Sequence, residues 1–285
     1  MSIEDQVRQA AAVLKAADAL LVTAGAGMGV DSGLPDFRGK QGFWRAYPAL
    51  AELGISFEEM ANPAWFKEDP ALAWAFYGHR LNLYRHTAPH AGFHELLQLG
   101  KSKAHGYFVF TSNVDGQFQK AGFSPERLVE CHGSIGHLQC RVPCTNEIWE
   151  ADGGPVNIDV SKFRALEPLP RCKNCRELAR PNILMSGDYS WLSHRTDRQR
   201  ERFSAWMDEL AEKSAKVAVI ELGAGGAIPT VRSTSEWVTG HLDGKLIRIN
   251  PREATVPPGQ ISLPLGATQA IQRIFGCGVN LSEPL

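Results

Sequence analysis

The sequence predicts an α/β fold, with a Rossmann-like parallel sheet domain beside a small module made of a zinc ribbon and a helical insert. Three observations lead to this prediction. Short apolar runs of strand type alternate with helical stretches, which is the pattern of a parallel sheet covered on both faces. The first of these runs leads directly into glycines at positions 25, 27 and 29. Two close pairs of cysteines occur in a stretch that is otherwise poor in apolar runs.

The composition argues against two classes of protein. The 285 residues are 44% hydrophobic and carry 30 Lys and Arg against 31 Asp and Glu, so the basic surface needed to neutralise phosphates is missing. No apolar run approaches the roughly 20 residues that span a bilayer. The first residues are acidic and polar, unlike a signal or transit peptide. We therefore expect a soluble, cytoplasmic protein with no nucleic-acid and no membrane partner.

The elements follow in order along the chain. Ser2 and Asp5 predict a capped helix start, and apolar residues recur behind them at helical spacing. Helical stretches such as residues 93–99 and 198–213 separate the predicted strands. Those buried strands are expected at residues 19–23, 107–112, 128–131, 183–185, 217–222 and 246–249.

Two segments break this alternation and are interpreted as insertions beside the sheet. Residues 42–100 are rich in Trp, Phe and Ala at helical spacing, and residues 136–180 hold the cysteine pairs. The chain is then a single unit, residues 1–285. Its large domain comprises residues 1–41, 101–135 and 181–285, and its small module comprises residues 42–100 (the helical insert) and 136–180 (the four-cysteine segment).

The cysteine spacing predicts a structural zinc site. Cys140 and Cys144 form one pair, Cys172 and Cys175 form another, and two such turns complete a tetrahedral site of four thiolates. Four cysteine ligands leave no open position for water, so the ion would be structural and not catalytic. A disulfide framework is not expected in a reducing compartment. The two remaining cysteines are interpreted as small buried hydrophobic residues.

The glycine loop after the first strand suits the pyrophosphate of a dinucleotide. Without side chains at Gly25 and Gly27, main-chain N–H groups can approach the phosphates closely. The full GxGxxG pattern is incomplete because Val30 occupies its last position, so a purely structural turn is an equal alternative. The next segment, residues 31–39, has the character of a loop that folds over a ligand; the alternative is a solvated loop with one buried aromatic side chain.

A set of short motifs occurs in order over nearly the whole chain: residues 25–27 with 32–39, 111–116, 131–133, the two cysteine pairs, 180–181, 187–188 and 249–250. In these motifs the sequence resembles the sirtuin family of NAD-dependent protein deacylases. The resemblance implies a single catalytic unit with a Rossmann-like domain and a small zinc-ribbon and helical module. NAD, as co-substrate, and the protein substrate would occupy the cleft between them, and Zn²⁺ would be structural.

The resemblance also implies roles for individual residues. His132 would be the base that deprotonates a ribose hydroxyl of NAD, a task that suits an imidazole titrating near neutral pH. Asn113 and Asp115 would lie at the nicotinamide ribose and complete the catalytic set. Phe37 would shield the C1′ carbon from water. The implied cofactor-binding residues are Gly25, Ala26, Gly27, Asp36, Phe37, Arg38, Ser112, Asn113, Asp115, His132, Gly223, Ala224, Gly225 and Asn250.

Three departures from the family pattern bear on NAD and substrate. Gly29 stands where many sirtuins have serine, and residues 223–225 read Gly-Ala-Gly in place of Gly-Thr-Ser. Main-chain N–H groups can compensate for the lost hydroxyls, so we expect NAD binding to survive. Residues 186–188 read Ser-Gly-Asp in place of Phe-Gly-Glu, so an aromatic side chain of the acyl-lysine channel is missing. By the same resemblance, Gly187 and Asp188 would still contact the substrate.

Other segments resemble a macrodomain-linked bacterial branch of the family that transfers ADP-ribose to proteins. These segments are residues 113–123, 181–185 with 187–188, and 228–229 with Arg232. That branch generally lacks the histidine that stands here as His132. The chain therefore combines the framework of one branch with the base of the other.

Tyr77 and Arg80 have the spacing that sirtuins acting on succinyl- or malonyl-lysine use to bind the distal carboxylate. Residues at positions i and i+3 share a helix face, so a phenol and a guanidinium could converge on one anion. In the alternative interpretation Tyr77 belongs to a packing stripe, and Arg80 lies in water.

We therefore expect an NAD-dependent protein-lysine deacylase that yields nicotinamide, free lysine and O-acyl-ADP-ribose, with an acyl-lysine protein or peptide as its partner. Two other reactions share the C1′ chemistry: transfer of ADP-ribose to a protein acceptor, and hydrolysis of NAD by water. A sensor that binds NAD without turnover is the remaining alternative.

Overall fold

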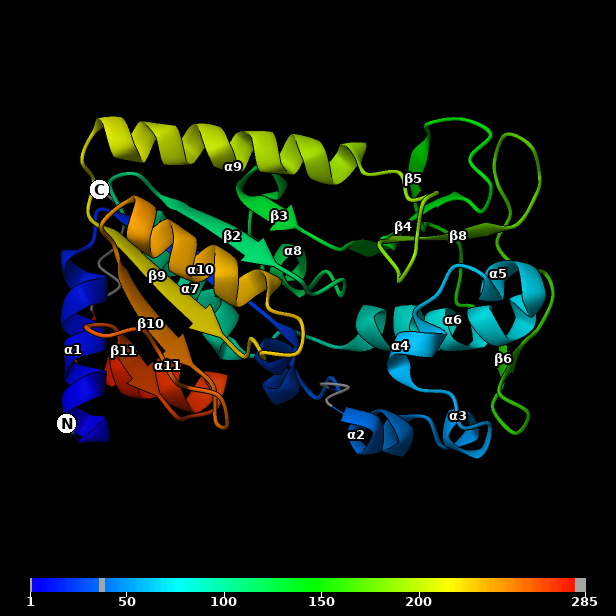
Figure 1. Ribbon diagram of the computed structural model, residues 1–285, viewed down its shortest axis with the longest axis horizontal. Coiled ribbons are helices and arrows are strands. Elements are labelled where there is room, and N and C mark those ends of the chain that lie inside the picture. Colours follow the sequence, from blue (N-terminus) through cyan, green and yellow to red (C-terminus); the bar gives the residue numbers. More distant parts are fainter. Residues whose placement is uncertain (1, 36–38, 280–285) are drawn as a thin grey trace.

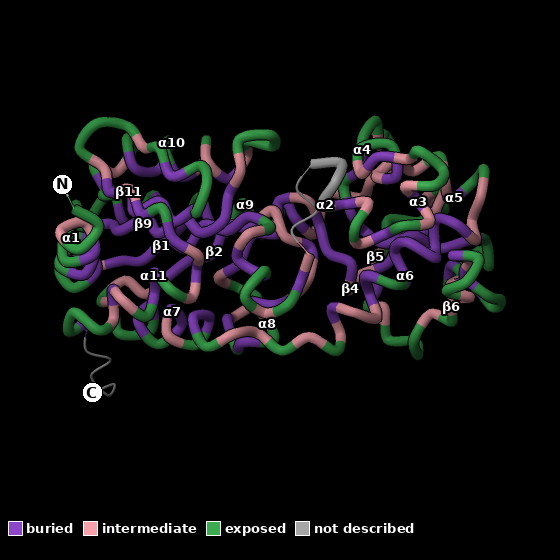
Figure 2. The backbone as a smooth tube through the Cα atoms, turned by 90° about the horizontal axis from the view of Figure 1, so that it is seen from below, coloured by how far each residue is buried: buried purple, intermediate pink, exposed green. Residues whose placement is uncertain are grey.

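A computed structural model describes residues 2–35 and 39–279 of the chain (Figure 1). The predicted site residues Asp36, Phe37 and Arg38 lie outside the described residues. The large domain occupies the left of Figure 1 and contains both ends of the described chain, and the small module occupies the right. Buried backbone runs through the middle of both parts (Figure 2).

The large domain is built on a six-stranded parallel sheet, as predicted. Its strand order is β11 (Ile261–Leu263), β10 (Lys245–Ile249), β9 (Val217–Leu222), β1 (Ala19–Ala24), β2 (Tyr107–Thr111) and β3 (Leu128–Glu130). Every residue of β1, β2 and β9 is buried, because helices cover both faces of the sheet. Strands buried on both faces need continuous apolar runs, which is why the sequence showed them clearly.

Helices pack on each face of the sheet around a separate hydrophobic cluster. The helices α1 (Ile3–Ala16), α7 (Ala91–Lys101) and α11 (Ala267–Gly276) cover one face. The helices α9 (His194–Glu212) and α10 (Thr230–His241) cover the other. The predicted cap of the first helix is confirmed: the Ser2 hydroxyl accepts from the N–H of Asp5, and the Asp5 carboxylate accepts from the N–H of Ser2.

The order in which the chain adds strands to the parallel sheet reverses at β1. From this strand the chain builds β2 and β3 on one side and β9, β10 and β11 on the other. In open α/β sheets of this order, ligands bind beyond the carboxyl ends of the strands at the reversal point. The topology therefore directs attention to the loops after β1 and β9.

The small module has its own core and its own sheet. Its helices are α2 (Gly39–Ala46), α3 (Pro48–Glu52), α4 (Phe57–Met60), α5 (Trp65–Glu68) and α6 (Pro70–His86). They pack beside an antiparallel sheet of β5 (Ile148–Glu150), β4 (Gly133–Cys140) and β8 (Ala179–Ile183), and a hairpin of β6 (Ile158–Asp159) and β7 (Arg164–Ala165). The indole N–H of Trp74 donates to the carbonyl of Ala179 at 3.0 Å and ties α6 to β8.

The structure differs from the sequence expectations at two strands. Of the predicted run at residues 183–185, only Ile183 lies in a strand: it ends β8, which is antiparallel to β4 and belongs to the small module. A three-residue apolar run cannot indicate which sheet it joins, because any buried strand has this pattern. The strand β11 was not predicted, because its three residues include the polar Ser262.

The packing also bears on the predicted extent of the helical insert, residues 42–100. Phe93 and Leu96 of α7 lie in the core under the parallel sheet, whereas Trp74 and Phe76 of α6 lie in the core of the small module. The packing of the insert thus changes between α6 and α7. Three short helical segments complete the fold: η1 (Ala26–Ser32), α8 (Gln117–Lys120) and η2 (Pro125–Arg127). Over the described part of the chain, every helix is too short or too polar to cross a membrane.

Candidate active site

The loops after β1 and β9 touch each other at the reversal point of the sheet. A Cβ added to Gly25 would lie 2.8 Å from the Cα of Ala224, and one added to Gly223 would lie 2.4 Å from the Cα of Gly27. The N–H of Gly27 donates to the carbonyl of Gly223 at 3.1 Å. Larger residues at Gly25 and Gly223 would collide with the main chain of the opposite loop. This close approach of two glycine loops is typical of a site for a dinucleotide pyrophosphate.

Asn113 connects the end of β2 to the same place. Its side-chain amide donates to the carbonyl of Gly25 at 3.0 Å, and its N–H donates to the hydroxyl of Thr111 at 3.0 Å. The N–H of Ser112 donates to the carbonyl of Ala24 at 3.1 Å. The predicted residues of the β1 and β2 loops are thus brought together by main-chain and amide contacts.

Asn250 connects the end of β10 to the loop after β9. Its amide donates to the carbonyl of Ala224 at 2.8 Å, and its side-chain oxygen accepts the N–H groups of Arg252 and Glu253, both at 3.0 Å. The side chain is fully buried. Asn250 therefore shapes the rim of the candidate site through the main chain of two loops.

His132 follows β3 and completes the row of polar residues at the strand ends. Burial lowers the pKa of its imidazole, and the nearby charge of Arg200 lowers it further. A hydrogen bond with the main chain of Ser112 acts in the opposite direction, because it favours the protonated ring. The carbonyl of His132 accepts the N–H of Leu184 at 3.0 Å, which fixes the backbone. The result is an oriented imidazole that is a neutral base at pH 7.

Asp115 has an unusually basic carboxylate for its type. Burial raises its pKa to about 6, and the charge of Glu130 raises it as well. The N–H of Gln117, which donates to the carboxylate at 2.9 Å, and the charge of Arg80 both lower it. The carboxyl group of Asp115, two residues after Asn113, therefore titrates close to neutral pH.

Two further residues hold the candidate site and were not found from the sequence. His90, which caps α7, contacts the carbonyl of Met28 with Nε2 at 3.0 Å, and its N–H donates to the hydroxyl of Ser32 at 3.0 Å. It thereby fastens η1 to the helix beneath it. The carboxylate of Glu253 accepts the N–H of Gly226 at 2.6 Å and so connects the loop after β10 to the loop after β9. Neither residue belongs to a recognisable short motif.

The carboxylate of Asp188, a predicted substrate residue, forms a buried ion pair with Arg180. Its two carboxylate oxygens accept from both terminal nitrogens of Arg180 at 2.7 and 2.8 Å, and both side chains are inaccessible to solvent. Gly187 lies next to it with a positive φ of 65°, which favours glycine. The ion pair anchors an otherwise exposed loop that includes Ser186 and Tyr189.

Tyr77 and Arg80 lie together on α6 but inside the core of the small module. The Tyr77 ring is 1% exposed and stacks on Phe66 with 5.5 Å between ring centroids. Arg80 is 7% exposed, its Nε donates to the hydroxyl of Tyr84 at 3.0 Å, and its guanidinium lies within 6 Å of four aromatic rings. Contrary to the packing alternative as stated above, Arg80 does not lie in water.

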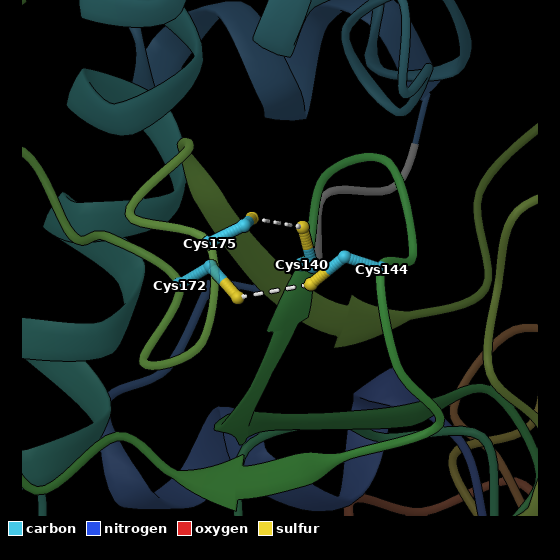
Figure 3. Close-up of side chains that lie close together, drawn as sticks. All are labelled: Cys140, Cys144, Cys172 and Cys175. Atoms are coloured by element: carbon cyan, nitrogen blue, oxygen red, sulfur yellow. Dashed lines mark hydrogen bonds between the residues drawn. The ribbon is translucent and has the colours of Figure 1, made fainter.

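The four cysteines of the two pairs converge, as Figure 3 shows. Their sulfur atoms lie within 4.8 Å of one another, with 3.6 Å between Cys140 and Cys175 and between Cys144 and Cys172. Four sulfurs bonded to one zinc ion are spaced at about 3.8 Å, so the cluster fits the ion. Cys140 ends β4, Cys144 lies in the loop between β4 and β5, and Cys172 and Cys175 lie in the loop before β8. Cys277, in contrast to expectation, is exposed.

This geometry places the chain among the dinucleotide-binding α/β proteins. Residues 25–213 match the family model described as the Sir2 family. The chain belongs to the Sir2 family, and the resemblance inferred from its motifs is confirmed.

Curated relatives match most of the chain. A protein of Thermococcus kodakarensis named NAD-dependent protein deacylase is 31% identical over 254 residues, which cover 87% of this chain and 86% of the relative. A Deinococcus radiodurans protein of the same name is 31% identical over 272 residues, covering 94% and 97%. The Pyrococcus furiosus protein of that name is 32% identical over 237 residues, covering 82% of each.

Solved structures have the same fold. A Sir2 homologue in complex with ADP-ribose matches with a TM-score of 0.72 and 24% identity, covering 97% of this chain and 98% of that structure. A Sir2 homologue in complex with NAD also matches with a TM-score of 0.72 and 24% identity, covering 96% and 94%. The predicted fold class is confirmed.

Proposed function

We propose that this chain is an NAD-dependent protein deacylase that converts an acyl-lysine protein or peptide, NAD and one water molecule into free lysine, nicotinamide and O-acyl-ADP-ribose. The observation that carries the proposal is the partly buried imidazole of His132, which follows β3, has a lowered pKa and is hydrogen-bonded to the main chain of Ser112. The Sir2 relatives named NAD-dependent protein deacylase support the reaction class.

The chain offers a complete set of groups to hold NAD. The pyrophosphate fits the touching loops at Gly25 and Gly223, and the adenosine ribose fits the rim between Ala224 and Glu253. Bound NAD supplies an electrophilic C1′ carbon once nicotinamide leaves. We assign the nicotinamide end to Asn113 and Asp115, which follow the neighbouring strand β2.

His132 moves the proton in the proposed reaction. The main chain of Ser112 accepts one ring N–H, so the other ring nitrogen is the free base. This ring nitrogen can take the proton from a ribose hydroxyl of NAD. The hydroxyl oxygen can then capture the acyl group. A protonated imidazole could not accept this proton. Because burial and the charge of Arg200 lower the pKa of His132, the unprotonated base is available at neutral pH.

Transfer of ADP-ribose to a protein acceptor is a second candidate, and one observation favours it. Ser186 is exposed in the loop where a sirtuin has the aromatic side chain of its acyl-lysine channel, so the acyl chain has one fewer apolar contact. In hydrolysis of NAD, water attacks the C1′ carbon in place of a protein acceptor. The three reactions differ only in the group that attacks C1′.

The acyl group is inferred from the surroundings of Arg80. Its Nε is engaged by Tyr84, and aromatic rings cover its guanidinium, so a distal carboxylate would have to displace these contacts. We therefore expect acetyl-lysine to be preferred over succinyl-lysine. The four-thiol cluster suits a reducing compartment, and we place the protein in the cytoplasm.

Mass spectrometry of the products tests these proposals. NAD is incubated with peptides that carry acetyl-, succinyl- or long-chain acyl-lysine, and with an added protein acceptor. O-acyl-ADP-ribose with free lysine is the expected result. An ADP-ribose adduct on the acceptor without deacylation would establish transfer instead, and nicotinamide with free ADP-ribose alone would establish hydrolysis.

Replacement of the base separates the steps of the reaction. In His132→Ala we expect deacylation to fall by at least about 100-fold, the lower range for loss of a general base, while some release of nicotinamide persists. Product analysis of wild type and variant at equal NAD measures both. Full deacylation by this variant would contradict the mechanism.

A further inference from the structure

A second cavity lies between the two parts of the molecule, separate from the glycine loops of the NAD site. It has a volume of about 660 Å³, within the range of sites for small molecules. Its walls come from α6, β4 and the segment after β5 in the small module, and from α8, η2 and α9 in the large domain. Figure 1 shows the start of α9 beside β5, where these walls meet. No described residue of the loops after β1, β9 or β10 lines it, but Asp115 and Gly116 of the loop after β2 do.

Buried polar atoms in and beside this cavity have no hydrogen-bond partner among the described residues. They are Nη1 of Arg195, Nδ1 of His137 and Oε1 of Glu130. Arg195 and His137 line the cavity, and the charges of Arg195 and Glu130 both act on the His137 imidazole. Buried polar atoms are nearly always hydrogen-bonded in folded proteins. Three such atoms, on residues that interact electrostatically, therefore indicate a site that holds a polar molecule or water.

The charges around the cavity favour an anion. The other terminal nitrogen of Arg195 pairs with Glu130 at 2.5 Å, which leaves Nη1 as a charged donor. The ammonium of Lys120 also lines the cavity; it donates to the main-chain carbonyls of Tyr84, Arg85 and Thr87, and the charge of Asp115 acts on it.

Neighbouring groups strengthen this preference. Arg198, on the same face of α9 as Arg195, lines the cavity and is exposed. Burial and the charge of Arg195 lower the pKa of His137, so its ring is neutral and can donate one N–H. The four carboxylates of Asp115, Glu126, Glu150 and Asp152 also line the cavity, and they exclude a ligand that is anionic over its whole length.

We propose that this cavity binds a small molecule through an oxyanion, a carboxylate or phosphate group, which accepts hydrogen bonds from Nη1 of Arg195 and Nδ1 of His137. The rest of the ligand lies toward Arg198 and the small module. Asp115 also lines the cavity, so a bound anion lies near a residue that we assign to the nicotinamide end of the NAD site. Because the cavity walls belong to both parts of the molecule, the anion connects α9 to β4, in which His137 lies five residues beyond His132.

Inorganic phosphate and citrate are the probes, titrated separately against the full-length protein by calorimetry at constant ionic strength with chloride as reference. Saturating ADP-ribose is present throughout, so that the pyrophosphate loops cannot hold the probe. Binding of either anion in the millimolar range or tighter is expected. Tighter binding of citrate would assign a carboxylate ligand, and tighter binding of phosphate a phosphorylated one. No heat of binding from either anion would overturn the proposal.

Three variants locate the binding. Arg195→Lys keeps the charge beside Glu130 but removes the second donor, and we expect about tenfold weaker binding. Arg198→Gln, at an exposed position, is expected to weaken binding by about threefold. The control Lys15→Gln removes the same charge from the exposed face of α1 and should bind as wild type. Equal weakening by Lys15→Gln, or none by Arg195→Lys, would overturn the site.

A spectroscopic measurement distinguishes occupancy from general charge effects. An oxyanion on Nδ1 of His137 should raise the pKa of that imidazole and move its ring resonances in two-dimensional NMR, with the same midpoint as the calorimetric titration. Unmoved His137 resonances at saturating anion would place the anion elsewhere and contradict the proposal.

Discussion

The protonation of His132 depends on a residue that lies on a different element. Arg200 of α9 is exposed, and its charge, after burial, lowers the pKa of the imidazole. Removing this charge makes protonation easier and raises the pKa. Below neutral pH a larger fraction of the protein then carries a protonated, inactive base.

We accordingly expect Arg200→Gln to move the acid limb of the kcat/KM profile to higher pH. The loss at pH 6 should be about twofold, the size of an interaction between partly solvated charges, and activity at pH 8 should be unchanged. The profile of Arg8→Gln, on the distant helix α1, serves as control. Coincident acid limbs for wild type and Arg200→Gln would refute the electrostatic role.

Asp115 should make the folded protein less stable at neutral pH. Its pKa of about 6 lies above the ordinary value of 3.8, so ionisation is harder in the folded chain than in the unfolded chain. This cost is complete above pH 6 and disappears below pH 4. Asp115→Asn should therefore raise Tm at pH 7.5 by about 2–4 °C and lose that advantage at pH 4. Thermal melts at both pH values measure this; a higher Tm of wild type at pH 7.5 would contradict it.

At the residue scale, the sequence predicted contacts that depend on short motifs. Gly25, Asn113 and Gly223 meet because each follows a strand of the same sheet, and parallel strands end at one edge. His90 and Arg200 could not be predicted in the same way, because their neighbours are set by how helices pack on that sheet. The roles of the residues in catalysis stay predictions.

The Arg180–Asp188 pair fixes a loop to the edge of the small sheet. Both side chains are fully buried, and removing one partner leaves the other charge without compensation. We expect Asp188→Ala to lower the free energy of unfolding by about 3–5 kcal/mol. Asp152→Ala, which removes an exposed carboxylate paired loosely with Lys173 at 3.8 Å, should have no measurable effect. Urea unfolding of the two variants compares them, and equal stability would show that the pair contributes little.

The cysteine cluster should support the small module through its metal ion. Cys172→Ser removes one of four thiolates, and we expect loss of bound zinc together with a lower Tm. Cys277→Ser, at the exposed cysteine after α11, should keep both. Metal analysis and thermal melts of the two variants measure these outcomes. An unchanged Tm after complete removal of zinc would show that the module is stable without it.

At the element scale, prediction succeeded where burial imposes a pattern. The strands β1, β2 and β9 are buried along their whole length and apolar over most of it because both faces are covered, and their runs appear in the sequence. The strand β8 was assigned to the wrong sheet because its pairing with β4 depends on residues 133–140, which lie 39 to 50 positions before their partners. Pairing partners are a property of the whole fold.

At the scale of the whole molecule, the cysteine-bearing part and the sheet are linked by shared elements rather than by one flexible linker. The strand β4 begins next to His132, pairs with β8 and ends at Cys140, so the proposed base and one of the four clustered cysteines are joined by one continuous segment. A change at the metal cluster is therefore expected to reach the reaction through the backbone of β4.

The central position of β1 has a consequence for synthesis on the ribosome. This strand pairs on one side with β2 and on the other with β9, so that Ala19 lies beside Val217. At typical rates of translation, roughly 10 to 40 seconds separate the emergence of these two partners. During that interval one edge of the most apolar strand has no neighbour, and the nascent chain depends on chaperones or on rapid elongation to keep that edge from pairing with another polypeptide.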